Sequence, residues 1–131
     1  MPPRSSIVTD PAASDQSILD AMTSEADVRE LALALPEVTE KPSYGTPGFR
    51  VADTLFARIR EEGVLVLWRE NEDEKQFLID AEPAKFFTIP HYDGHPLVLL
   101  RLDAVDRDEL GDLLEQSWRV RAPGRLAGDD D

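Results

Sequence analysis

The sequence of 131 residues has no cysteine, only two histidines, and no apolar run near the roughly 20 residues that a membrane-spanning helix needs. Without cysteine there is no disulfide framework, no thiolate metal site and no thiol nucleophile. The opening stretch MPPRSSIVTDPAASDQS lacks the apolar core of a secretory signal. We therefore expect a cytoplasmic protein that does not associate with membranes.

Basic residues are also scarce, because 14 Lys and Arg stand against 27 Asp and Glu, for a formal net charge of -13. Non-specific binding to nucleic acid depends on Lys and Arg displacing the counterions of phosphates. A chain this acidic is repelled at long range by DNA, RNA and anionic membranes. Nucleic-acid binding would therefore require a local basic patch.

The composition divides the chain into three parts. Residues 1–22, which are rich in Pro, Ser, Ala and Asp, predict a flexible N-terminal tail. Residues 127–131 predict a short acidic C-terminal tail. Residues 23–126 carry the apolar patterns of one ordinary domain, and most of the acidic residues lie within it.

Apolar residues at helical spacing predict three helices. The first covers residues 24–35, with Ser24 and Asp27 as its capping pair, and the second begins near Asn71. The third covers residues 106–121 and ends before Pro123. The residues expected to face inward are Val28, Leu31, Ala32 and Leu35 in the first helix, Phe77, Leu78 and Ala81 in the second, and Leu110, Leu113, Leu114 and Trp118 in the third.

Five extended segments are predicted at residues 39–42, 49–51, 54–60, 64–69 and 97–101. Short loops join the first four, so these strands must be antiparallel. The resulting order is one helix, several strands, a second helix, one strand and a third helix. This pattern indicates an α+β fold of two layers, with an antiparallel sheet of about five strands and the helices packed on one face.

The stretch SYGTPGF combines turn-forming and apolar residues. A phosphate-binding loop would contain a Gly-rich motif with Lys leading into a helix, whereas here Lys is missing and a strand follows. We therefore interpret the stretch as a corner between strands. Its predicted motif residues are Tyr44, Gly45, Thr46, Pro47 and Phe49.

Catalytic and metal chemistry have little support. In the loop HYDGH, His91, Asp93 and His95 are spaced so that they could bind one divalent metal ion. Asp and His beside Gly and Pro serve equally in turn chemistry, which is the interpretation we prefer, so we predict no metal and no cofactor. There is no Gly-x-Ser-x-Gly elbow and no recognisable nucleophile–base pair, so we expect no enzyme activity.

Arginines recur in the strand-rich middle and near the C-terminus. Alternation along residues 54–60 predicts that Phe56 shares a sheet face with Arg58 and Arg60, with Trp68 one strand away. Aromatic rings interleaved with Arg on a sheet face can stack bases and follow a backbone. The candidate nucleic-acid-binding residues are Arg58, Arg60, Arg69, Arg119, Arg121 and Arg125.

Four separated stretches, SYGTPGFRV, LFARI, AEPAKFFTIPHYDGHPLVLLRL and SWRVRAPGRL, together resemble the MmcQ/YjbR family. The resemblance implies a compact two-layer α+β domain similar to frataxin-like and secretion-chaperone-like folds. It also implies DNA binding with a double-wing motif, and it implies no catalytic residues. The positions of the family motifs correspond here to Tyr44, Gly45, Thr46, Pro47, Phe49, Pro90, His91, Tyr92, Trp118, Arg119, Pro123 and Arg125.

Our leading hypothesis is a small, non-enzymatic binding domain of this type. The resemblance implies that its ligand is DNA. The alternative is a protein-interaction or chaperone-like adaptor whose acidic surface attracts basic partners. A metal-assisted or other enzyme is the third hypothesis.

Overall fold

The computed structural model describes residues 23–124, so the predicted tails at 1–22 and 127–131 and the candidate Arg125 lie outside the described residues. Three helices form, α2 (Glu25–Leu33), α3 (Glu72–Ala81) and α4 (Arg107–Arg121), and they begin directly after Ser24, Asn71 and Asp106. Asn71 and Asp106 each accept a hydrogen bond from a backbone N–H three residues on. None of the helices in residues 23–124 has the length and apolar character that crossing a bilayer requires.

All strand pairs of the sheet are antiparallel, which confirms the predicted fold class, and the sheet has six strands in the order β2-β3-β4-β5-β7-β6. The sixth is β6, a two-residue strand that is not among the five predicted segments. The strands are β2 (Val38–Ser43), β3 (Thr46–Val51), β4 (Thr54–Glu61), β5 (Val64–Trp68), β6 (Phe86–Phe87) and β7 (Leu97–Arg101).

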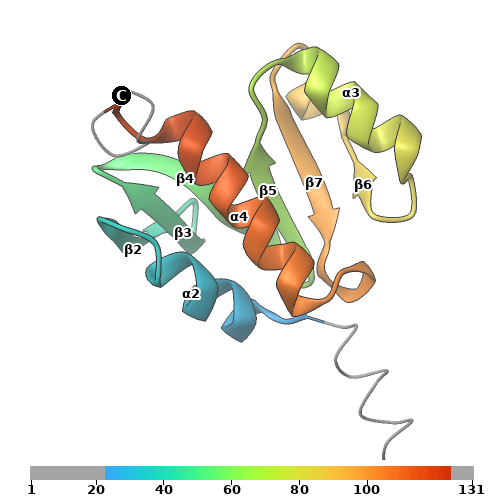
Figure 1. Ribbon diagram of the computed structural model, residues 1–131. Helices are drawn as coiled ribbons and strands as arrows, with labels where there is room; N and C mark the ends of the chain where they lie inside the picture. The colour runs from blue at the N-terminus through green and yellow to red at the C-terminus, as the bar shows by residue number, and fades with distance from the viewer. Residues whose placement is uncertain (1–22, 125–131) are drawn as a thin grey trace, which may run out of the picture.

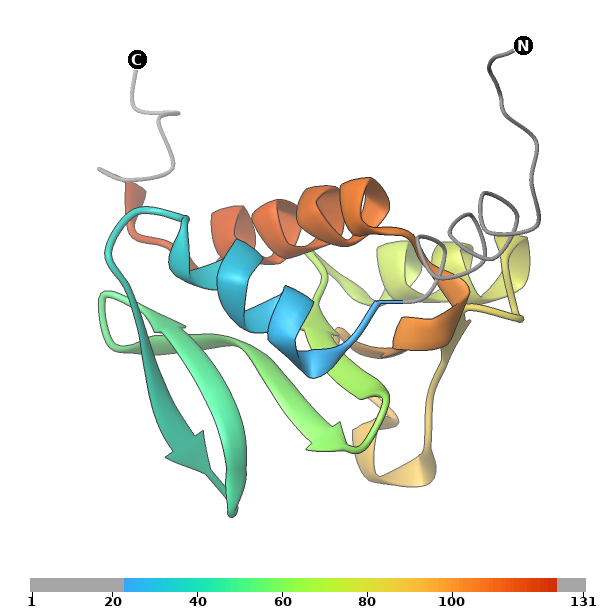
Figure 2. The ribbon, with the colours of Figure 1, turned by 90° about the horizontal axis from the view of Figure 1, so that it is seen from below.

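The helices lie together on one side of the sheet, as predicted, with α4 running across its middle (Figure 1). Figure 2 shows this helical layer above the sheet, with the β2–β3 hairpin and the loop around η1 (Pro90–Tyr92) extending away from it on the opposite side. We call the sheet surface opposite the helices the open face. A second short 3-10 helix, η2 (Leu102–Ala104), leads from β7 towards α4.

The core lies between the helical layer and the sheet. Trp118 of α4 is only 4% exposed, and its indole N–H donates to the carbonyl of Pro36. Phe49 of the SYGTPGF stretch is fully buried in the same core. The largest fully buried side chains include Phe49, Phe56, Phe86, Leu65, Leu67, Leu100, Leu110 and Leu114.

Helix α3 differs from the predicted orientation. Phe77 and Ala81, which were expected inside, are exposed, and the Phe77 side chain is 69% exposed. Lys75 is buried instead, and Leu78 and Ile79 pack against the core. The helix has this orientation because the Lys75 ammonium donates to two loop carbonyls, an interaction that apolar spacing does not reveal.

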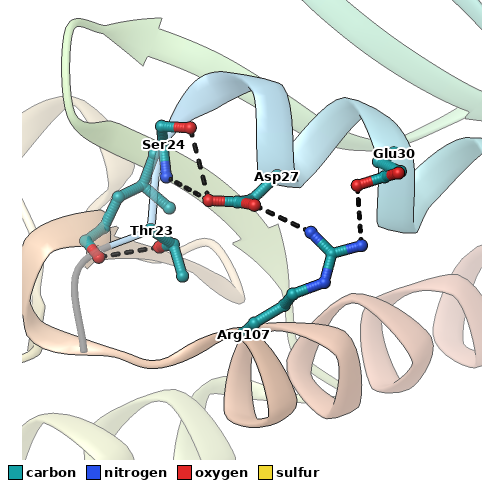
Figure 3. Close-up of polar contacts among 6 residues, drawn as sticks. Thr23, Ser24, Asp27, Glu30 and Arg107 are labelled. Atoms are coloured by element: carbon teal, nitrogen blue, oxygen red, sulfur yellow. Dashed lines mark hydrogen bonds and ion pairs between the residues drawn. The ribbon is translucent and has the colours of Figure 1, made fainter. Parts of the chain in front are cut away.

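The start of α2 is tied to the start of α4 by polar contacts (Figure 3). Arg107 donates to Asp27 and to Glu30, each at 2.7 Å, and its pKa is raised mainly by the hydrogen bond to Glu30. The Ser24 backbone N–H donates to Asp27 at 2.9 Å, and the Thr23 hydroxyl donates to the carbonyl of Leu102 at 2.7 Å. These contacts hold α2 beside α4 in the helical layer.

Candidate nucleic-acid interface

The open face of the sheet carries both apolar and basic side chains. Strand alternation directs Lys41, Arg50, Arg58, Arg60 and Arg101 to this face, and the register pairs Lys41 with Gly48 and Gly48 with Arg58. Between them, a second apolar cluster lies away from the main core. Its buried members are Val66, Tyr92 and Leu99, with Val64, Trp68, Phe87, Ile89 and Leu97 packed against them.

A β-bulge in β4 changes which residues reach the open face. The register passes from Phe49 opposite Ala57 to Arg50 opposite Leu55, so Phe56 is an extra residue. Phe56 is therefore fully buried in the main core, and the prediction that it shares a face with Arg58 and Arg60 is wrong. Leu55 takes the place beside these arginines on the open face.

Two carbonyl groups of β4 at the bulge accept hydrogen bonds from side chains of α4. The Ser117 hydroxyl donates to the carbonyl of Phe56 and accepts from the backbone N–H of Trp68 at 2.8 Å. Arg121 Nε donates to the carbonyl of Leu55 at 2.9 Å. The Arg121 guanidinium also lies 5.1 Å from the centre of the Trp68 ring, and burial lowers its pKa. Arg121 therefore joins the helical layer to the open face.

Tyr44 stands at the tip of the β2–β3 hairpin. Its φ of 56° and the φ of 83° at Gly45 form a two-residue hairpin turn, with a non-glycine residue in the left-handed region. The side chain of Tyr44 is 89% exposed. The Arg58 guanidinium lies 4.9 Å from the Tyr44 ring centre, and its Nε donates to the carbonyl of Ser43 at 3.3 Å.

The loop around η1 forms the opposite border. Tyr92 is buried, and its hydroxyl oxygen lies 3.4 Å from Nη1 of Arg58, which donates to it. The guanidinium of Arg60 lies 5.7 Å from the Tyr92 ring centre, and the exposed His91 contacts the same ring edge-on. From α3, the buried Lys75 ammonium donates to the carbonyls of Tyr92 at 2.7 Å and His95 at 2.9 Å, so it fixes this loop.

Between the hairpin and this loop lies a concave pocket of about 490 Å³, which we call the open-face pocket. A neighbouring hollow of about 550 Å³ shares Tyr44 and Leu55 and is lined in addition by Arg50 and Arg121. The open-face pocket is lined by Tyr44, Leu55, Arg58, Arg60, Val66, Trp68, His91, Tyr92 and Leu97. An apolar floor with a cationic and aromatic rim suits a ligand that is flat and carries negative charge.

The ion pairs of residues 23–124 are segregated by face. Arg29, Arg69, Lys85, Arg107 and Arg119 each meet a carboxylate on a helix. Arg29 also pairs with Glu40, and this hydrogen bond lowers the pKa of Glu40. In contrast, the open-face bases form no ion pair within the same range. Their partners are carbonyl groups and rings: Arg50 with Asp53, Arg58 with Ser43, Tyr44 and Tyr92, Arg60 with Tyr92, and Arg101 with Pro83, Ala84 and Phe87.

The structure brings together only some of the candidate residues. Arg58, Arg60 and Arg121 converge on the open face with Tyr44, His91 and Tyr92. Arg69 is buried on the helical side, where Gln116 and Glu74 each accept from it at 2.9 Å. Arg119 pairs with Glu115 on α4 at 2.9 Å. Neither Arg69 nor Arg119 lines the open-face pocket.

Sequence reasoning missed several residues of the open face. Arg101 shares it with Leu97 and Leu99, an alternation that is visible along β7 in the sequence. Leu55 was hidden by the bulge, which no sequence signal marked. For the alternative metal site, residues 23–124 contain no group of three His, Asp or Glu side chains placed to hold an ion.

Comparisons with known proteins identify the family of the chain. A family model described as YjbR matches residues 33–120. Uncharacterized proteins of Mycobacterium tuberculosis and Mycobacterium bovis are 36% identical to the chain over 74 residues, which is 56% of this chain. The chain spans about half the length of these curated relatives, since the match covers 50% of each.

A solved structure has the same fold. The crystal structure of the Deinococcus radiodurans protein DR2400, with the family domain DUF419, matches with a TM-score of 0.64 and 24% sequence identity. The match covers 76% of this chain and 78% of that one. The fold, the family model and the motif stretches agree, and the chain therefore belongs to the YjbR family.

Proposed function

We propose that the protein is a non-enzymatic binding domain that binds nucleic acid through the open face of its sheet. The observation that carries this proposal is the open-face pocket, where Arg58 and Arg60 lie among aromatic rings without a carboxylate partner in residues 23–124. Arginine pairs with phosphate through fixed, charge-assisted hydrogen bonds, and aromatic rings stack on bases.

The negative net charge is compatible with this proposal because the charges are unevenly distributed. On the helical side, basic residues are neutralised by helix carboxylates, and the first turns of α2, α3 and α4 carry further acidic residues. An anionic strand approaching that side is repelled, whereas on the open face it meets guanidinium groups. The same asymmetry would orient the protein on its ligand and keep non-specific binding weak.

The experiment is a salt titration of binding to a fluorescein-labelled oligonucleotide of twelve thymidines, followed by anisotropy. If Arg58, Arg60 and Arg121 each contact a phosphate of the single strand, the logarithm of the binding constant should fall with the logarithm of the salt concentration with a slope of about -2. Arg58→Gln or Arg60→Gln should weaken binding roughly tenfold by removing a charged hydrogen bond.

The matched control is Arg119→Gln, because Arg119 is an arginine on the helical side paired with Glu115. This variant should bind as tightly as the parent protein. Absence of binding at low salt would contradict the proposal, as would an equal loss in the Arg119→Gln variant.

A protein-interaction adaptor is the second candidate, and Phe77 favours it. This ring is exposed on α3, where Asp73 lies four residues before it and Asp80 three residues after it. An exposed aromatic ring surrounded by acids suits a basic peptide with an apolar residue. In a titration with a labelled Lys- and Arg-rich peptide of twelve residues, Phe77→Ala would weaken binding and Arg58→Gln would not. The two functions use opposite sides of the molecule, so these variants separate them.

A further inference from the structure

The shape of the open-face pocket narrows the class of nucleic acid. We propose that the pocket receives one unstacked base of a single strand, with the neighbouring phosphate on Arg58 and Arg60, so that the protein selects single strands over duplexes. This inference rests on the proposed function and adds the form of the ligand to it.

The floor and walls of the pocket suit the face of a base better than the edge of a helix. Leu55, Val66 and Leu97 form an apolar floor, and the Trp68 ring lies at the end of β5 beside them. With a volume of about 490 Å³ the pocket has the scale of a small-ligand site. A base in a duplex has both faces covered by its stacked neighbours, and extruding it costs a few kcal/mol. In a single strand, which has no base pairs to break, exposing the face of a base costs less free energy.

The Arg58 guanidinium, which would bind the phosphate, is held in position before a ligand binds. Arg58 donates through Nε to the carbonyl of Ser43 and through Nη1 to the hydroxyl of Tyr92. Its second terminal nitrogen, Nη2, has no hydrogen-bond partner among the described residues. Because the hairpin and the η1 loop both orient this guanidinium, little rotamer freedom is lost when a phosphate binds.

The backbone conformation at Tyr44 also indicates a contact with the ligand. A tyrosine in the left-handed region is strained, and Gly or Asn would form this turn at lower cost. The ring is nevertheless almost fully exposed and borders both hollows. The turn therefore places an exposed aromatic ring at the border of the pocket, where the ring can contact a ligand. We assign to Tyr44 the stacking contact on the outer side of the bound base.

The test compares three labelled ligands by anisotropy at constant low salt: twelve thymidines, the same chain with abasic sites, and the thymidine chain paired with twelve adenosines. The inference predicts that the abasic chain binds about 5- to 150-fold more weakly, which is the range for losing one stacked base. The duplex should also bind more weakly than the single strand. Tryptophan fluorescence supplies a second readout, because Trp68 lines the pocket while Trp118 is buried in the core.

The matched variants are Tyr44→Asn and Phe77→Ala. Asn tolerates the left-handed turn, so Tyr44→Asn removes the ring and keeps the hairpin. This variant should lose at least fivefold in affinity for the thymidine chain, whereas Phe77→Ala, which removes another exposed ring, should lose none.

The outcomes separate this inference from the function on which it rests. If all three ligands bind equally and Arg58→Gln weakens each, the proposed function stands and the base pocket is wrong. Equal binding by Tyr44→Asn and the parent protein overturns the stacking role of Tyr44. If no ligand binds, both the proposed function and this inference fail.

Discussion

Two glycines illustrate how much the consequence of a residue depends on its surroundings. A Cβ atom added to Gly48 of β3 would lie 2.9 Å from Cβ of Ser43 and 3.1 Å from Cδ1 of Leu55. Gly48 is therefore required by the close approach of its neighbours, not by a left-handed backbone. We expect Gly48→Ala to lower the free energy of unfolding by about 1–3 kcal/mol through overpacking, as measured by chemical denaturation.

Gly111 of α4 is the matched control for this change. Its added Cβ would meet Leu31 at 3.8 Å, an ordinary contact, and alanine is the better helix former. Gly111→Ala should therefore raise the free energy of unfolding by about 0.5–1 kcal/mol. If both variants shift stability in the same direction, the crowding at Gly48 is not the reason for glycine there.

The arginines show why residue type alone does not identify a binding site. Arg58 lies on β4 and Arg69 directly follows β5, and both were candidates for nucleic-acid binding from the sequence. The structure places Arg58 on the open face and fills the surroundings of Arg69 with Gln116 and Glu74. A helix that follows β5 and a helix near the C-terminus provide these partners, so only the tertiary fold distinguishes the two residues.

At the scale of elements, one serine of α4 bridges strands β4 and β5 beside the β4 bulge. Ser117 is fully buried and bonds to the Phe56 carbonyl and to the Trp68 N–H. We predict that Ser117→Ala lowers the free energy of unfolding by about 1–3 kcal/mol, because a buried donor and a buried acceptor lose their partner. Thermal or urea denaturation followed by circular dichroism measures this loss.

Ser43→Ala is the comparison variant. Ser43 is also buried, but its hydroxyl makes no hydrogen bond with the other residues described here, so the variant should be closer to the parent protein in stability. Equal losses in the two variants would show that the bridge made by Ser117 contributes little.

The elements themselves were largely predictable. Asn71 and Asp106 act as N-caps, and Trp118 and Leu114 of α4 are buried as their spacing indicated. The bulge at Phe56 was not predictable, because a strict period of two cannot accommodate an extra residue. The orientation of α3 was also missed, since a buried Lys75 contradicts the usual preference of lysine for water.

At the scale of the whole molecule, the fold separates charge that the composition mixes. The helical layer gathers carboxylates with their arginine and lysine partners, and the sheet leaves its own arginines to rings and carbonyl groups. Net charge therefore predicts the solubility and long-range repulsion of this protein better than it predicts what the open face binds. The candidate site combines parts of β4, β5, β7, a hairpin tip and a 3-10 loop, which only become neighbours in the folded sheet.

Binding of nucleic acid by the open face is tested most directly by titrating isotopically labelled protein with the oligonucleotide of twelve thymidines. The titration is followed by amide and indole chemical shifts. The two indole N–H signals are built-in reporters, because Trp68 lies on the open face and Trp118 donates to Pro36 in the core. We expect shifts at the Trp68 indole and at the backbone of the hairpin, β4 and the η1 loop, with the Trp118 indole unchanged. Shifts confined to the outer surfaces of α2, α3 and α4, with a silent Trp68 indole, would contradict this expectation.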